Sequence, residues 1–144
     1  MNLLHRTYRK FRAEGLPASH AMHAARTELA WDEAEAAGLV RLRWVPDEEC
    51  YDDSYIDTWT DVRECDRKRM RKDLWAQIER DGVWGIVAEY VSPVCPCCAH
   101  GGVWEQGGSV WGFVGDRDCG YESDVKSECL DALAKARAES AHAA

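Results

Sequence analysis

The densest group of reactive side chains lies in the middle of the chain, where residues 95–100 read C-P-C-C-A-H. A C-P-x-C turn lets two thiolates face one metal ion while backbone N–H groups point at the sulfurs, a spacing typical of zinc knuckles. Tetrahedral zinc needs four ligands, and one knuckle supplies only two of them. The predicted ligands of a structural zinc are Cys95, Cys98, His100 and Cys119, with Cys97 and Cys65 as alternatives.

Two other interpretations of these thiols stay open. No second C-x-x-C accompanies the first, and it is the paired knuckle that strongly indicates zinc. The segment can equally be a tight turn between strands with small, partly buried thiols. A redox role for Cys95 and Cys98 is disfavoured, because the pair does not open a helix whose N-terminus would lower a thiol pKa. Seven cysteines without an export signal also predict no disulfide framework.

A second group of chemically distinctive residues is acidic. Residues 47–61 contain no Lys or Arg, so charge repulsion and the turn preference of Asp predict an exposed loop. Its aromatic residues are candidate anchors for a protein partner. The predicted partner-binding residues are Asp47, Glu48, Glu49, Tyr51, Asp52, Asp53, Tyr55, Asp57 and Trp59. A basic helix surface follows at residues 63–72, and the simpler alternative is that loop and helix neutralise each other.

The sequence gives no positive support for catalysis. It contains no phosphate-binding loop, no G-x-S-x-G nucleophile elbow and no H-E-x-x-H metal motif. The segment D-R-D-C-G-Y-E from Asp116 resembles a calcium loop only superficially, because its glycine stands at the fifth position and its twelfth residue is Ser127. Most tryptophans lie beside apolar neighbours and are expected in the core, whereas Trp104 and Trp111 are expected to be partly exposed. The prediction is therefore a binding protein and not an enzyme.

Composition limits the fold and the setting. A chain of 144 residues fits one domain, and 46% hydrophobic residues with seven Trp exclude a disordered chain. A formal net charge of −8 repels a phosphate backbone and argues against general affinity for nucleic acid. There is no apolar run of about 18 residues and no signal-peptide core, so we expect a cytosolic protein that does not bind membranes.

Hydrophobic periodicity predicts the elements that position these groups. Helical spacing covers residues 2–14, 19–38, 61–81 and the stretch from Ser123 onward, and strands are predicted at 39–45 and 82–91. Residues 103–106 and 109–114 are predicted to form a hairpin across Gly107-Gly108, a pair that suits tight primed turns. The result is a single α+β domain over residues 1–144, with about four helices on a small, mostly antiparallel sheet of about four strands. If the first two strands are parallel neighbours, the helix between them makes a right-handed crossover.

Several of these segments together resemble a group of small proteins encoded by bacteriophages, prophages and plasmids. The segments are W-G-I-V-A-E-Y from Trp84, the C-P-C-C run, S-V-W-G-F-V-G-D from Ser109 and G-Y-E-S-D-V from Gly120. The resemblance covers about residues 84–133, and this chain has Ala99 where that pattern has glycine after the knuckle. It implies no activity. It implies a setting in which small acidic proteins are often inhibitors of host defence, including anti-CRISPR proteins.

The leading hypothesis combines that setting with the acidic segment. An effector that grips nucleic acid presents a channel lined by Lys and Arg, which an acidic, aromatic loop could occupy as a DNA mimic in the host cytosol. The partner is then a host defence protein or nucleoprotein complex and not bare nucleic acid. One alternative is a zinc-stabilised nucleic-acid-binding or regulatory module that uses the basic helix at 63–72. A second alternative is an enzyme acting on the defence complex, and exposed aromatic residues could also serve a homodimer.

Overall fold

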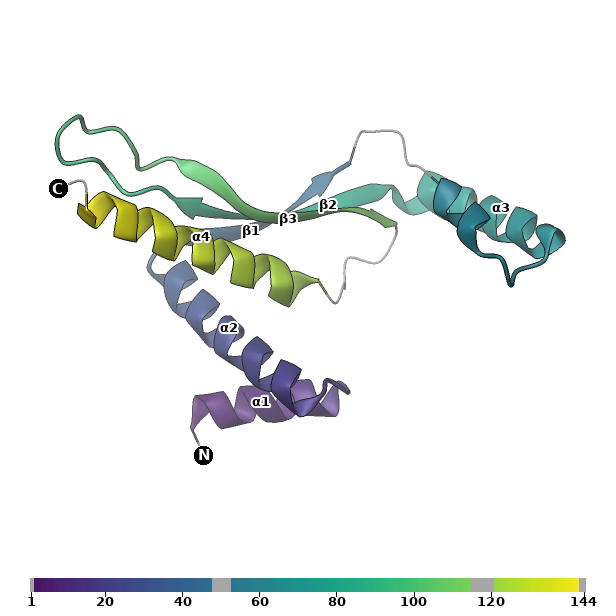
Figure 1. Cartoon of the computed structure of the whole chain (residues 1–144), viewed down its shortest axis with the longest axis horizontal. Helices are drawn as coiled ribbons and strands as arrows, with labels where there is room; N and C mark the ends of the chain where they lie inside the picture. Colours follow the sequence, from purple (N-terminus) through teal and green to yellow (C-terminus); the bar gives the residue numbers. More distant parts are fainter. Residues whose placement is uncertain (1, 48–52, 115–120, 143–144) are drawn as a thin grey trace. The chain divides into compact units, whose positions relative to one another are not determined.

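The computed structural model describes residues 2–47, 53–114 and 121–142. The predicted α+β class is confirmed: four helices accompany one three-stranded antiparallel sheet with the strand order β1-β2-β3 (Figure 1). The elements in chain order are α1 (Leu3–Ala13), α2 (Ala18–Ala36), β1 (Val40–Pro46), the 3-10 helix η1 (Ser54–Thr58), α3 (Glu64–Asp81), β2 (Val83–Val91), β3 (Trp104–Val114) and α4 (Glu122–His142).

The register of the sheet is set by hydrogen bonds at the two ends of β1. The Val91 N–H donates to the Leu39 carbonyl at 2.9 Å, and the Asp47 N–H donates to the Val83 carbonyl at 2.8 Å. Residue numbers rise on one strand as they fall on the other, so β1 and β2 are antiparallel neighbours. The parallel crossover considered from the sequence is therefore wrong. β2 is the central strand, and all its residues are buried or half-buried.

The predicted hairpin across Gly107-Gly108 is also wrong, because β3 runs without interruption through both glycines. A Cβ atom at Gly107 would lie 2.7 Å from the Cα of Cys129, and one at Gly108 would lie 2.8 Å from the carbonyl oxygen of Val125. Both distances are too short for a real Cβ. The glycines therefore let α4 approach the strand closely, and the three strands observed replace the four expected.

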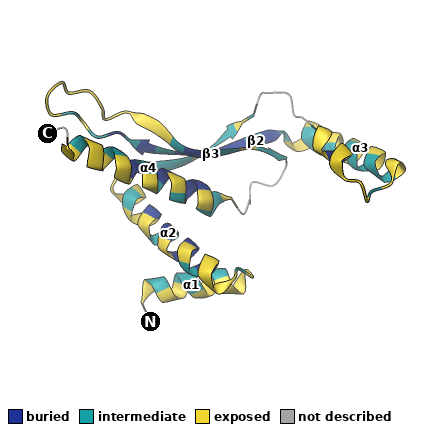
Figure 2. Cartoon of the chain, viewed as in Figure 1, coloured by how far each residue is buried: buried dark blue, intermediate teal, exposed yellow. Residues whose placement is uncertain are grey.

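The described chain divides into two compact units. The first unit comprises Met1–Arg43, Val87–Ser109 and Gly120–Ala144, and the second comprises Trp44–Ile86 and Val110–Cys119. In the first unit α2 contacts both α1 and α4. Figure 2 shows buried residues on α2 and α4, and the small side chains of alanines 21, 24 and 25 let neighbouring helices approach α2 closely.

The core of the first unit contains one buried cation. Lys126 in α4 is 6% exposed, and its ammonium group lies 3.1 Å from Glu28 in α2 and 3.1 Å from Glu122. It also lies 5.5 Å from the ring centroid of Trp31, whose side chain is fully buried. The two carboxylates compensate the loss of water around the ammonium, so this ion pair belongs to the packing of α2 against α4.

The second unit is held by aromatic contacts on the strands and by the packing of η1 on α3. The rings of Trp44 and Phe113 meet edge to face at 5.9 Å. The Trp111 ring covers Gly85, since a Cβ atom there would lie 2.1 Å from the ring. Trp111 nevertheless remains 47% exposed, and Trp104 in the first unit is 38% exposed, which confirms the expectation for both residues.

Across the described residues, no helix combines the length and the apolar composition that a membrane crossing requires.

Candidate functional site

Three cysteines gather on the loop between β2 and β3, and we call Cys95, Cys97 and Cys98 the thiol turn. The Sγ atoms of Cys95 and Cys97 are 3.1 Å apart, so one thiol donates to the other. The Ala99 N–H donates to the Cys95 carbonyl at 2.9 Å, and the Cys95 N–H donates to the His100 carbonyl at 2.6 Å. These two bonds close the turn at its base.

The thiol turn changes the acidity of its first cysteine. Hydrogen bonds from the Cys97 side chain and backbone, followed by those of Cys98, lower the pKa of Cys95 from 9.0 to about 7. A donor aimed at sulfur stabilises the thiolate in the same way as a helix N-terminus does. The pair does not open a helix, as the sequence predicts, and the donors around Cys95 come from the turn instead.

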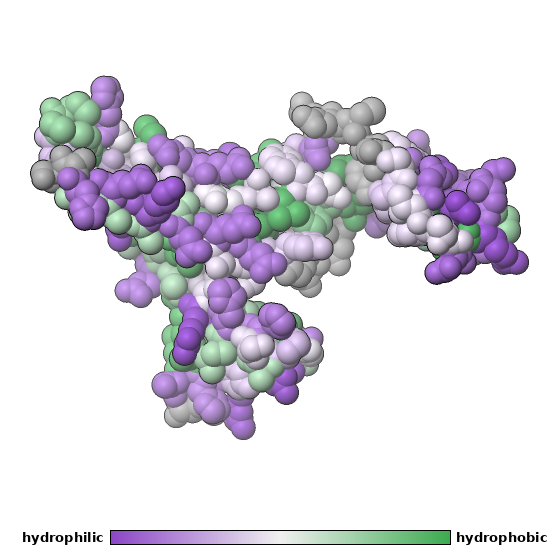
Figure 3. All heavy atoms as spheres, in the orientation of Figure 1, coloured by the Kyte–Doolittle hydropathy of each residue, from purple (hydrophilic) through white to green (hydrophobic). Residues whose placement is uncertain are grey.

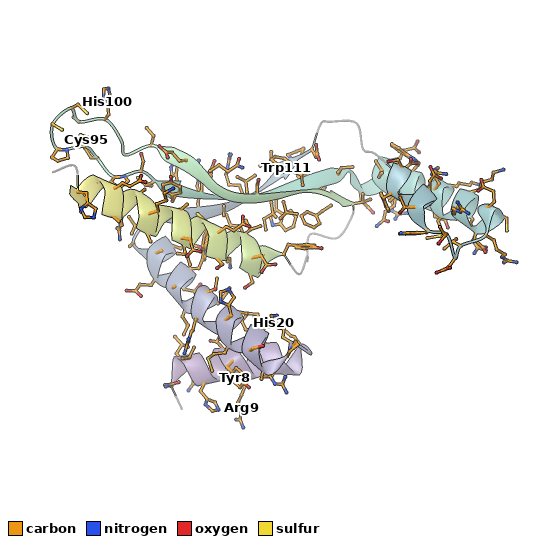
Figure 4. All side chains as sticks on the ribbon, viewed as in Figure 1. Tyr8, Arg9, His20, Cys95, His100 and Trp111 are labelled. Atoms are coloured by element: carbon orange, nitrogen blue, oxygen red, sulfur yellow. The ribbon has the colours of Figure 1, made fainter. Side chains whose placement is uncertain are left out.

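The predicted zinc ligands are only partly brought together. Among the residues that the structure describes, no three His, Cys, Asp or Glu side chains converge on one point. Figure 4 shows Cys95 and His100 on the same loop, with the His100 side chain projecting outward from it. Cys119 lies outside the described residues, and Cys65 is exposed on α3 in the other unit. Zinc binding stays a prediction.

A second candidate site is formed by η1 and the neighbouring face of α3, and we call it the η1 face. Arg71 of α3 donates from Nε to Asp53 at 3.0 Å and from a terminal nitrogen to Asp57 at 2.9 Å. The indole N–H of Trp75 donates to the same oxygen of Asp53 at 2.8 Å. The bonds to Asp57 and Asp53 raise the pKa of Arg71 above its ordinary value. Asp53 and Asp57, two of the predicted partner-binding residues, therefore hold η1 on α3.

Two predicted aromatic anchors belong to the η1 face. The rings of Tyr55 and Trp59 meet edge to face with their centroids 5.7 Å apart. Tyr55 is 40% exposed and Trp59 is 38% exposed, so each ring offers part of its surface to solvent. Asp57 between them has a side chain that is 62% exposed, whereas that of Asp53 is 22% exposed. The η1 face therefore presents a fixed aromatic pair beside one accessible carboxylate.

The remaining predicted partner-binding residues are Asp47 and four residues that the structure does not describe. The backbone of Asp47 pairs with Val83 at the end of the sheet. Glu48, Glu49, Tyr51 and Asp52 lie outside the described residues.

The basic surface of α3 is largely neutralised within the second unit. Asp66 pairs with Arg63 at 2.9 Å and with Arg69 at 3.1 Å, and Glu64 lies 3.9 Å from Arg67. Figure 3 shows the surface over α3 as mostly hydrophilic. Together with Arg71, these pairs favour mutual neutralisation of loop and helix over a phosphate-binding helix.

Sequence reasoning missed three features of these sites. The pairing of Arg71 with Asp53 joins residues 18 positions apart through a loop whose path the sequence does not reveal. The contact between Cys95 and Cys97 depends on the shape of the turn, and its signal in the sequence is the C-x-C spacing inside the knuckle. Trp75 was not singled out, although its indole N–H is a donor that a neighbouring acidic segment can satisfy.

No protein-family model, curated protein or solved structure matches this chain. The functional argument therefore rests on the thiol turn and the η1 face themselves.

Proposed function

We propose that this protein is a non-enzymatic inhibitor of a nucleic-acid-targeting defence complex of its host, which it binds through the η1 face. The observation that carries the proposal is the exposed pair Tyr55–Trp59 beside the accessible carboxylate of Asp57. Aromatic residues that are ordered before binding lose little side-chain entropy on association, and they dominate the energetics of protein interfaces.

Charge supports a basic partner. The formal net charge of −8 draws the protein toward surfaces rich in Lys and Arg and speeds the encounter at low salt. Asp53 and Asp57 share the guanidinium of Arg71, so these three side chains together carry one net negative charge. The channel of an effector that grips nucleic acid has the complementary sign. The resemblance to phage and plasmid proteins supports the same class of partner.

Binding to a defence effector tests the proposal. The tagged protein is used to capture partners from nuclease-treated lysates of a bacterium that carries defence systems, with washes at low and at high salt. We expect a nucleic-acid-binding effector that is released by salt and that loses its nucleic-acid binding or cleavage when the purified protein is added. Such loss is required, since capture alone does not establish inhibition.

Matched variants locate the contact. Trp59→Ala is expected to weaken the inhibition about tenfold or more, as is usual for an aromatic residue at the centre of an interface. Trp104→Ala is the control, because Trp104 is exposed to the same 38% and belongs to the first unit. Asp57→Lys reverses the accessible charge and leaves Asp53 to hold η1. Equal inhibition by the Trp59 and Trp104 variants would remove the η1 face from the proposal.

A further inference from the structure

We propose that the thiol turn is a thiol–disulfide exchange site, in which Cys95 attacks a small-molecule disulfide and Cys97 then closes a Cys95–Cys97 disulfide. This inference concerns a loop of the first unit and does not depend on the partner proposed for the η1 face.

The first support is the distance between the two sulfurs. The Sγ atoms of Cys95 and Cys97 are 3.1 Å apart, and a disulfide bond is about 2.05 Å long. Small rotations of the two side chains bring the sulfurs into bonding distance. Among the other described cysteines, Cys98 also hydrogen-bonds the Cys95 thiol, whereas Cys65 lies on α3 and Cys129 is buried beneath β3.

The second support is the surroundings of the attacking sulfur. Cys95 accepts hydrogen bonds from the backbone N–H groups of Cys97 and Cys98, which stabilise a negative charge on its sulfur. The thiolate is the nucleophile in disulfide exchange, so donors of this kind identify the attacking cysteine. Cys95 is half-buried, whereas Cys97 and Cys98 are exposed, and a small disulfide can therefore approach the turn from solvent.

The third support is the backbone that fixes the turn. Ala99 has a φ of 57°, in the left-handed region that non-glycine residues rarely adopt. Gly101 has a φ of 113°, and a Cβ atom there would lie 2.0 Å from the carbonyl oxygen of Pro93. The loop is anchored beyond this point by Ser92 and Val103, which join its two ends by a hydrogen bond of 2.9 Å. Left-handed non-glycine residues persist where neighbouring structure enforces them, and they cluster at functional sites.

The exchange proceeds in two balanced steps. The Cys95 thiolate attacks one sulfur of the small disulfide, which forms a mixed disulfide and releases one small thiolate. The Cys97 thiol then loses its proton and attacks the Cys95 sulfur, which breaks the mixed disulfide and releases the second small thiolate. Two protein thiols are oxidised to one disulfide, and one small disulfide is reduced to two thiols. In the reverse direction the oxidised turn accepts electrons from a small thiol.

Glutathione disulfide serves as the probe. The reduced, full-length protein is treated with it at neutral pH, and the products are followed by intact mass and peptide mapping. We expect the mass to fall by that of two hydrogens, and we expect peptide mapping to show a disulfide between Cys95 and Cys97. Cys97→Ser should accumulate the mixed disulfide on Cys95, because the resolving thiol is missing. Cys95→Ser should slow oxidation of the turn by about tenfold or more, and Cys65→Ser is the matched control that leaves the rate unchanged.

Three results would overturn the proposal. The first is oxidation of the turn in Cys95→Ser at the rate of the unsubstituted protein. The second is formation of a Cys95–Cys98 disulfide in Cys97→Ser at the rate at which the unsubstituted protein is oxidised, which would show that Cys97 is not the required second thiol. The third is a stoichiometric metal ion in the purified protein that blocks the reaction until it is chelated. None of these measurements involves the host partner, so their failure is distinguishable from failure of the proposed function.

Discussion

At the residue scale, the surroundings of each cysteine decide its chemistry. Cys95 sits among hydrogen-bond donors, and its pKa falls to about 7. Cys129 is fully buried against β3, and burial raises the pKa of its thiol from 9.0 to about 11. The pKa of the same functional group is therefore lowered in the loop and raised beneath the sheet, although the sequence alone does not separate the two environments.

The buried thiol predicts a loss of stability at alkaline pH. Its folded-state pKa lies above the unfolded value, so its contribution to stability is fully present below pH 9 and is lost as the pH rises through about 11. We expect the free energy of unfolding to fall less steeply between pH 8 and pH 11 in Cys129→Ala than in the unsubstituted protein, as measured by urea unfolding. Tyr90, whose pKa is raised by its bond to Glu105, keeps some of the slope in both proteins. Parallel pH curves would contradict the assignment.

At the scale of elements, η1 depends on one carboxylate. Asp53 accepts hydrogen bonds from Arg71 and from Trp75, and its side chain is mostly shielded from solvent. Asp53→Ala is expected to cost about 1.5–3 kcal/mol of unfolding free energy, because the bond to the guanidinium is charge-assisted and the indole donor loses its partner. Urea unfolding followed by tryptophan fluorescence measures the loss.

Asp57→Asn is the control for that element. Its carboxylate bonds the same guanidinium but is 62% exposed, and exposed ion pairs contribute about 0–1 kcal/mol. Asp57→Asn should therefore lower the free energy of unfolding clearly less than Asp53→Ala does. If the Asp57 variant were as unstable as Asp53→Ala, η1 would be held by the shared cation and not by Asp53.

The elements were predictable where their signal is local. The helical spacing of apolar residues located all four helices, and the alternation in residues 39–45 located β1, because both patterns depend on the side chains of one element. The hairpin predicted at Gly107-Gly108 was wrong, because a glycine pair fits both a tight turn and a strand that another backbone approaches closely. Only the position of α4 decides between these two meanings, and that position is a tertiary property.

At the scale of the whole molecule, charge distinguishes the proposed inhibitor from the alternative of a protein that binds nucleic acid through its basic helix. The net charge is −8, and Glu64 and Asp66 pair with three arginines at the N-terminal end of α3. We expect no gel shift of duplex DNA or single-stranded RNA at low salt, where electrostatic binding is strongest. A shift that weakens steeply with added salt would favour the basic-helix alternative, and its loss in Lys68→Glu/Lys72→Glu would place the contact on α3.

The candidate sites were predictable in composition but not in arrangement. The sequence located the acidic, aromatic segment and the cysteine-rich turn, because unusual composition is visible in one dimension. It did not reveal that Arg71 joins Asp53 and Asp57, or that the sulfurs of Cys95 and Cys97 are in contact. Both facts depend on how a loop folds back, which no short-range pattern determines.

Two glycines of the sheet differ in whether a change at a neighbouring residue can make room for a side chain. At Gly85 the three atoms nearest to an added methyl group all belong to the ring of Trp111, so a smaller residue at 111 could compensate, and the two positions can change together over generations. At Gly107 the added methyl group would meet the Cα of Cys129, which every substitution at 129 retains. Divergent descendants of this chain should therefore exchange the first glycine in step with its partner and keep the second unchanged.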